Sequence, residues 1–258
     1  MKELEKVKEL IINSGNNFHC KVHNYLVGKN WAVLVSPYYN DNISEKPREI
    51  DLIAEKAFVV NDAWGRQKGH INIKLFIECK YITQEFVFWF HDKNMNKARE
   101  LVLATTPLPD THVSTEKHHY LSGNKRVAKL FASDNRKASE NEPFYKALNQ
   151  SLNAMVYYRD GDSIIPPLHR GYRNTLSIVN YPIIICNSFN TFYKVDIEKT
   201  DAPENIKDNF QLEVNYAYMD VNKNHRNEYF LIDVVNYEEA DKFLEILQQD
   251  IDAISAII

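Results

Sequence analysis

Two strand-like segments of this chain carry charged residues inside otherwise apolar runs. Residues 48–55 read REIDLIAE, and residues 75–81 read LFIECKY. Burying an unpaired carboxylate or ammonium group is costly, so a fold retains such charges only where they pair or bind a metal. We therefore expect Asp51, Glu78 and Lys80 to carry the chemistry of this protein.

The two segments are predicted to form a β-hairpin, with strands at about residues 49–60 and 71–82. The turn-forming sequence NDAWGRQKG separates them. Side chains two residues apart share a face of a strand, so Glu78 and Lys80 point the same way. A turn that is symmetric about its centre places Asp51 opposite Lys80 and diagonal to Glu78. Cross-strand neighbours of this kind lie roughly 5–8 Å apart, so the two carboxylates can converge on one ion.

Two carboxylates beside a lysine suit a hard divalent cation. Mg²⁺ prefers oxygen ligands and usually combines one or two protein carboxylates with water and substrate phosphate. We predict Asp51 and Glu78 as ligands of Mg²⁺, for which Mn²⁺ can substitute. Such an ion polarises a phosphoryl oxygen and helps to generate hydroxide. Lys80 would hold the attacking water and offset negative charge.

These residues resemble the motif of the PD-(D/E)XK nuclease superfamily, an Asp on one strand and Glu-x-Lys on the next. The similarity covers about the first third of the chain and includes a predicted helix that begins near Gly15. It implies an α/β, restriction-endonuclease-like core in which helices flank a central mixed β-sheet. It also implies metal-dependent hydrolysis of phosphodiester bonds, usually in DNA. Asp51, Glu78 and Lys80 occupy the motif positions.

The chain departs from the family pattern at two positions. Ile50 stands where the family name has proline. Many relatives carry a glutamate on the first core helix, in the context Gly-x-x-Phe-Glu, whereas here Phe18 is followed by His19. Because His19 stands at this position, the chain lacks the glutamate that would bind a second metal ion or support the site.

Three further side chains are weaker candidates. Gln150 shares a helix face with Tyr157, and some superfamily members place a glutamine and a tyrosine on the helix after the Glu-x-Lys strand. The resemblance therefore implies that Gln150 lines the site, and the alternative is a solvated helix face. Glu49 and Glu55 share the strand parity of Asp51 and could reach the metal. The alternative, favoured for Glu55, is a strand-end charge in solvent.

The rest of the chain is predicted to complete one domain over residues 1–258. A helical and polar insertion at about 105–170 follows the third strand and contains a strong amphipathic helix. Other predicted features are a loop at 37–47, a helix at 92–103, a loop at 161–171, strands at 183–186, 210–221 and 228–235, and a closing helix at 237–254.

Bulk properties narrow the class of protein. A net charge of −4 and a pI of about 6.1 argue against non-specific coating of nucleic acid, but they allow a nuclease with a local basic surface. Three scattered cysteines without a CxxC pair indicate neither a disulfide framework nor a zinc ribbon. With no signal-like or membrane-spanning run, we expect a cytoplasmic protein with no membrane partner. The sequence leaves a homodimer open.

Two functions remain open from the sequence. The first is a Mg²⁺-dependent DNA endonuclease, with a setting in restriction or defence by fold analogy. The second is a catalytically inactive nuclease-fold module that binds nucleic acid or a protein partner. The presence of Asp51, Glu78 and Lys80 favours the enzyme, because a module freed from catalysis has no physical reason to keep them in apolar strands.

Overall fold

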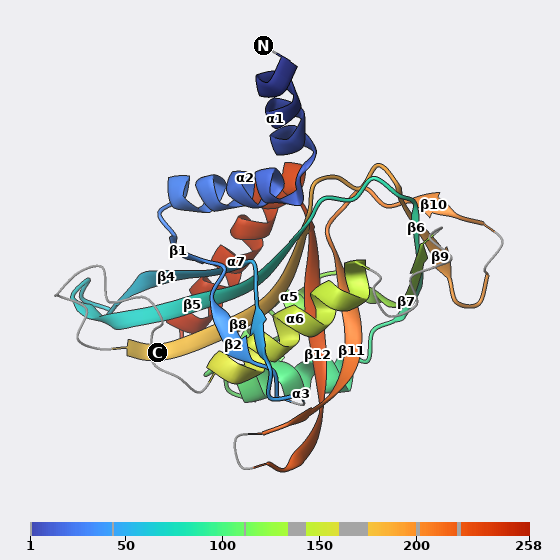
Figure 1. Cartoon of the computed structure of the whole chain (residues 1–258). Coiled ribbons are helices and arrows are strands. Elements are labelled where there is room, and N and C mark those ends of the chain that lie inside the picture. The colour runs from blue at the N-terminus through green and yellow to red at the C-terminus, as the bar shows by residue number, and fades with distance from the viewer. Residues whose placement is uncertain are drawn as a thin grey trace.

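A ten-stranded mixed β-sheet forms the centre of the molecule (Figure 1). The structure, a computed structural model, describes residues 2–42, 44–110, 112–133, 143–159, 175–199, 202–220 and 223–258. The strand order of the central sheet is β1-β4-β5-β8-β12-β11-β7-β6-β9-β10. These strands are β1 (Ala32–Val35), β4 (Leu52–Asn61), β5 (Gln67–Lys80), β6 (Phe86–Asp92), β7 (Arg126–Ser133), β8 (Thr175–Cys186), β9 (Phe192–Asp196), β10 (Glu204–Asn205), β11 (Phe210–Met219) and β12 (His225–Asn236).

The pairing of the strands confirms the expected mixed character of the sheet. β1, β4 and β5 form an antiparallel meander, and β8 then lies parallel to β5. β12 continues the parallel run beside β8, and β11 returns antiparallel to β12. The chain therefore belongs to the α/β class, with a large mixed central sheet between helices.

Helices cover both faces of this sheet. α2 (Gly15–Gly28), α3 (Met95–Thr105), α5 (His119–Ser122) and α7 (Ala240–Ser255) contribute to the core on one face. α6 (Pro143–Tyr158) packs on the opposite face, against β5 and β8. Shorter elements complete the described fold: α1 (Lys2–Asn13), α4 (His112–Thr115) and the 3₁₀ turn η1 (Tyr237–Glu239).

Local sequence explains how β5 and α2 form. β5 alternates between the two cores: Ile73 and Ile77 pack on the α2 face, and Phe76 packs on the α6 face. This two-residue period is the expected signature of a central strand that is buried on both sides. At α2, the Ser14 hydroxyl accepts a hydrogen bond from the Asn17 N–H at 3.3 Å and caps the helix.

Two predictions about chain organisation are corrected. The predicted loop at 37–47 contains a small separate hairpin, β2 (Tyr38–Asn40) with β3 (Pro47–Glu49). The predicted insertion at 105–170 is not only helical and polar, because β7 lies within it and joins the central sheet. Its pairing with β6 and β11 satisfies the backbone groups of an otherwise polar stretch. The predicted loop at 161–171 lies outside the described residues.

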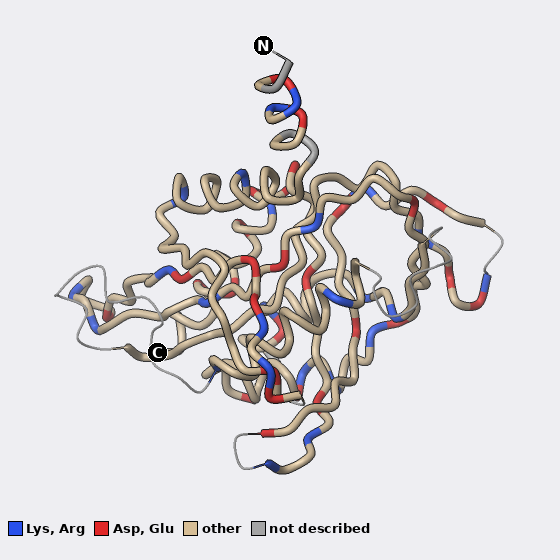
Figure 2. Tube along the Cα trace, in the orientation of Figure 1, with Lys and Arg blue, Asp and Glu red and all other residues tan. Residues whose placement is uncertain are grey.

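Charged positions are interspersed along the whole trace (Figure 2). Figure 2 shows blue and red positions mixed on the hairpins and helices, without a continuous stripe of one sign. No helix among the described residues combines the length and the apolar character that a membrane crossing requires.

Candidate functional site

Asp51, Glu78 and Lys80 meet at one end of the β4–β5 hairpin. Asp51 directly precedes β4, and Glu78 and Lys80 lie at the C-terminal end of β5. The pairing of Leu52 with Ile77 brings Asp51 across from Glu78. The predicted pairing of Asp51 with Lys80 is therefore wrong by two residues. The turn is centred near Trp64 rather than between Gly65 and Arg66, because Asn61 pairs with Gln67. A one-residue register shift between Val60 and Asn61 then gives the pairing of Leu52 with Ile77.

The corrected register keeps the three side chains on one face, because a two-residue slip preserves strand parity. They are linked by hydrogen bonds. The Lys80 ammonium donates to Glu78 Oε2 at 2.7 Å. The Cys79 backbone N–H donates to Asp51 Oδ2 at 2.7 Å, and the Asp51 backbone N–H lies 3.4 Å from Glu78 Oε1. The arrangement fixes both carboxylates relative to the β5 backbone.

Burial decides the electrostatics of this cluster. The Glu78 side chain has 0% exposure, and that of Lys80 has 17%. Burial raises the pKa of Glu78 to about 7, although the Lys80 charge opposes the rise. Burial alone would lower the pKa of Lys80, but the charges of Glu78 and Asp51 outweigh it and raise that pKa. Lys80 thus stays cationic beside a carboxyl group that titrates near neutral pH.

The donor set at this place fits a hard divalent cation. Asp51 and Glu78 offer carboxylate oxygens, the ligand type that Mg²⁺ and Mn²⁺ prefer. A cation beside Glu78 would compensate a buried negative charge that Lys80 alone now balances. Asp51 is partly exposed, so the cluster has a side that faces water.

Gln150 hydrogen-bonds the segment that leads into Asp51. Its Nε2 donates to the backbone carbonyl of Glu49 at 2.7 Å. The same helix, α6, also contacts the β2–β3 hairpin through Tyr158, whose hydroxyl donates to the Tyr38 carbonyl at 2.7 Å. α6 therefore braces the hairpin that leads into Asp51.

Tyr39 is a neighbour of the site that the sequence did not single out. It is 2% exposed, in the middle of β2. Burial raises the pKa of its hydroxyl, and the charges of Glu78 and Asp41 raise it further. The sequence pattern did not indicate this position, because Tyr39 lies in a stretch rich in Asn, Asp and Ser that predicts a loop.

The two other acidic candidates lie at different depths. Glu55 is only 6% exposed, and its Oε1 accepts a hydrogen bond from Asn72 Nδ2 at 2.9 Å. The expectation that Glu55 reaches solvent is therefore wrong, because β4 is covered at that point. Glu49 is half-buried, and its side chain hydrogen-bonds the Tyr38 hydroxyl and raises the pKa of that phenol.

A second polar cluster lies on the opposite face of the sheet. Ligand atoms of His118, His119 and Asp250 lie within 4.8 Å of one another, so the group could hold a metal by spacing alone. The His119 backbone N–H donates to Asp250 Oδ1 at 2.7 Å, and the Tyr181 hydroxyl donates to Asp250 Oδ2 at 2.9 Å. His119 Nε2 lies 3.2 Å from an oxygen of Asp233.

Hydrogen-bond roles favour an ion network over a metal in this second cluster. His118 Nδ1 accepts from the Tyr120 N–H at 3.2 Å, so its proton is on Nε2, which then has no lone pair for a metal. Both nitrogens of His119 face carboxylate oxygens of Asp233 and Asp250, which only accept, so both carry protons. The described contacts are thus satisfied by a buried imidazolium between two carboxylates.

The pKa shifts agree with this assignment. Burial alone would lower the pKa of His119, but the charges and hydrogen bonds of Asp250 and Asp233 raise it to about 10. Burial lowers the pKa of His118 to about 4. Burial alone would raise the pKa of Asp250, whereas its two histidine neighbours bring it below its usual value.

Comparisons of the chain with protein-family models, with curated proteins and with solved structures found no match. The chemistry of the Asp51, Glu78 and Lys80 cluster is therefore the basis for assigning a function.

Proposed function

We propose that this protein is a divalent-metal-dependent nuclease that hydrolyses phosphodiester bonds, with DNA as its substrate. One observation carries the proposal: Asp51 and Glu78 lie across from each other on adjacent strands, on the same face as Lys80. This is the arrangement that the Asp and Glu-x-Lys motif requires. A biological role in restriction or defence rests only on the similarity of this motif to that of the nuclease superfamily.

Each of the three residues has a task that follows from its position. Asp51 and Glu78 would hold Mg²⁺ or Mn²⁺, which when bound polarises the phosphoryl group and favours hydroxide over water. Lys80 is cationic and lies 2.7 Å from Glu78, so its ammonium can donate to a water or phosphate oxygen beside that carboxylate. A positive charge there stabilises the negative charge that develops during attack.

The test is cleavage of supercoiled plasmid, linear DNA and RNA in Mg²⁺, Mn²⁺ and EDTA. We expect metal-dependent cleavage of DNA by the unaltered protein. Asp51→Asn and Lys80→Met should each reduce the rate at least about a hundredfold. Glu85→Gln is the matched control, since Glu85 is an exposed carboxylate just beyond β5. Cleavage by Lys80→Met at the unaltered rate would contradict the assignment, and cleavage of RNA alone would contradict the substrate.

The alternative is a catalytically inactive module with the same core. The observation in its favour is that Glu78 is fully buried and already paired with Lys80, as in a structural ion pair. Calorimetric titration with Mn²⁺ separates the two functions. Binding that Asp51→Asn abolishes supports the nuclease, and absence of binding to the unaltered protein supports the module.

A further inference from the structure

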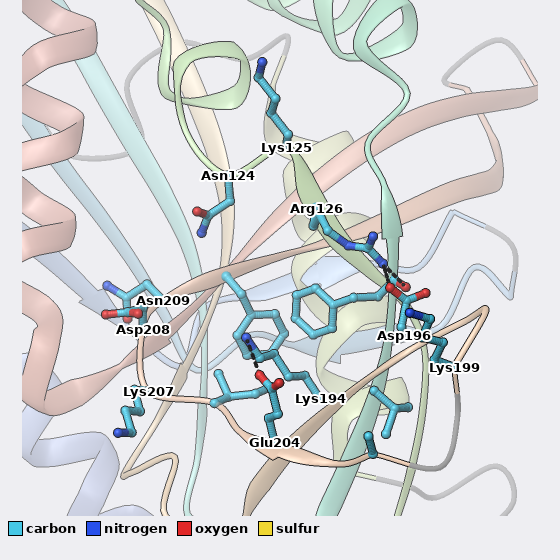
Figure 3. A pocket seen from close by; sticks show the side chains of 15 residues that line it. Asn124, Lys125, Arg126, Lys194, Asp196, Lys199, Glu204, Lys207, Asp208 and Asn209 are labelled. Carbon is cyan, nitrogen blue, oxygen red and sulfur yellow. Dashed lines mark hydrogen bonds and ion pairs between the residues drawn. The ribbon is translucent and has the colours of Figure 1, made fainter.

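A cavity of about 540 Å³ lies at the far edge of the central sheet, away from Asp51 and Glu78. Its walls come from β6, β9, β10 and the segment that leads into β11 (Figure 3). Four strands, β8, β12, β11 and β7, stand between β5 and β6 in the sheet order. The volume is in the range of small-molecule sites. This distal cavity is therefore separate from the proposed metal centre.

The charge of the distal cavity is opposite to that of the chain. Five cationic and three acidic side chains line it, whereas the whole chain has a net charge of −4. Two of the cations are neutralised: Arg126 pairs with Asp196 at 2.7 Å, and Lys194 pairs with Glu204 at 3.3 Å. Figure 3 shows both pairs on the wall of the cavity.

Three lysines remain for an anionic ligand. Lys125, Lys199 and Lys207 are exposed and have no ion-pair partner within the described parts of the chain. Figure 3 places Lys125 and Lys207 at opposite sides of the rim. Lysine ammonium groups at the rim of a cavity are suited to phosphate oxygens, which they meet as point charges.

The floor of the distal cavity is apolar. Phe90 and Phe210 line it, with ring centroids 5.5 Å apart and planes tilted by 52°. Ile206 and Val195 are also part of the lining. Aromatic side chains of this kind provide contact area for a nucleobase. An apolar floor beneath a cationic rim matches a molecule that has a flat ring at one end and phosphate at the other.

A second, smaller cavity of about 290 Å³ adjoins the first, since Asn124, Asn209 and Phe210 line both. Gln211, which lines this inner cavity, is 7% exposed. Its Nε2 donates to Asp233 at 3.1 Å, but its Oε1 has no hydrogen-bond partner in the part of the chain that the structure describes. Neighbouring residues of a strand point to opposite faces, so Gln211 lies on the α7 face and Phe210 on the α6 face, and the inner cavity is not part of the proposed site.

We propose that the distal cavity binds a nucleoside phosphate, whose base lies against Phe90 and Phe210 and whose phosphates meet Lys125 or Lys207. This site is independent of the metal centre and of the nuclease proposal.

Isothermal titration calorimetry on the full chain in EDTA tests the site without metal at Asp51 and Glu78. The probes are ATP, GTP, inorganic tripolyphosphate and a single-stranded oligonucleotide. We expect saturable binding of ATP or GTP and at least tenfold weaker binding of tripolyphosphate. Lys125→Glu with Lys207→Glu should weaken nucleotide binding at least tenfold, and Lys21→Glu, an exposed lysine on α2, should not change it.

Phe90→Leu gives a second test that concerns the base alone. This variant should weaken binding of ATP or GTP and leave binding of tripolyphosphate unchanged. If it does not fold, as judged by its circular dichroism, the exposed lysine variants decide the result. The proposal is overturned by no binding of either nucleotide, by equal binding of tripolyphosphate, by binding of the oligonucleotide only, or by unchanged affinity in the double lysine variant.

Discussion

Two buried carboxylates of the described fold each have a charged partner at hydrogen-bond distance. Glu78 has Lys80, and Asp250 has His119. Removing one member of such a pair leaves the other uncompensated, which costs far more than the net contribution of the intact pair. The two clusters differ in exposure: one faces water through Asp51, and the other is enclosed on the opposite face of the sheet.

The enclosed cluster predicts a pH-dependent stability. The pKa of His119 is about 10 in the folded protein, against an ordinary value near 6.5, so the folded state binds more protons between these values. Its stabilising effect is complete below about pH 6.5 and is lost as the pH rises through 10. Asp250→Asn should lower the free energy of unfolding by about 3–5 kcal/mol at pH 6, and the deficit should shrink toward pH 10.

Urea unfolding of both proteins at pH 6, 8 and 10 measures this difference. Asp252→Asn, an exposed carboxylate on the same helix, is the control and should leave the free energy of unfolding unchanged. A deficit for Asp250→Asn that stays constant across the three pH values would show that His119 is not the titrating group.

Among the elements, α6 and the β2–β3 hairpin set the position of the candidate site. Side chains of α6 hydrogen-bond to the hairpin: Gln150 to the Glu49 carbonyl, Tyr158 to the Tyr38 carbonyl, and Asn153 to Asp41 Oδ2 at 3.2 Å. Asp51 follows the hairpin after one residue, so a shift of the hairpin moves the carboxylate.

Gln150→Ala should therefore affect both stability and metal binding. Loss of its bond to the Glu49 carbonyl is expected to cost about 1 kcal/mol in the free energy of unfolding. It should also weaken Mn²⁺ binding in a calorimetric titration. Asn149→Ala is the matched control, because the Asn149 amide donates only to Tyr145 within the exposed face of α6. Equal Mn²⁺ affinity in the two variants would argue against a bracing role.

The sequence predicts elements whose residues are periodic and neighbouring in the chain. The β4 and β5 strands, α2, α6 and α7 follow from such periods, as does the shared face of Asp51 and Glu78. The register of Asp51 did not follow, because the turn is centred near Trp64 and a register shift lies between Val60 and Asn61. β2 and β3 are too short and polar to have a period. His119 and Asp250 are 131 residues apart, so only tertiary structure reveals their contact.

At the scale of the whole molecule, the sheet and the core on its α6 face run without a boundary from β4 to β9. The core on the α6 face includes Ile53 and Phe76 near one end and Phe88 and Phe192 near the other. A core that is continuous over this distance transmits the loss of packing from one end to the other. We therefore expect the described fold to unfold as one unit.

Tryptophan fluorescence can check this cooperativity. Trp31 is buried beside α2, and Trp89 is in β6 at the distal part of the sheet. With the exposed Trp64 replaced by Phe, the variants Trp31→Phe and Trp89→Phe each report one end. Their urea midpoints, corrected for the stability of each variant by circular dichroism, should coincide. An earlier transition reported by Trp89 would indicate that the distal strands unfold separately.

The parallel pairing of β5 with β8 has a consequence for biosynthesis. Lys80 pairs with Cys186, a partner that the ribosome makes only after the whole intervening segment. Until then β5 has one unpaired edge, and Glu78 lacks the neighbouring strand that buries it. Such an edge invites pairing with other chains. The nascent protein therefore holds Asp51, Glu78 and Lys80 in an incomplete environment, and their final arrangement forms only late in translation.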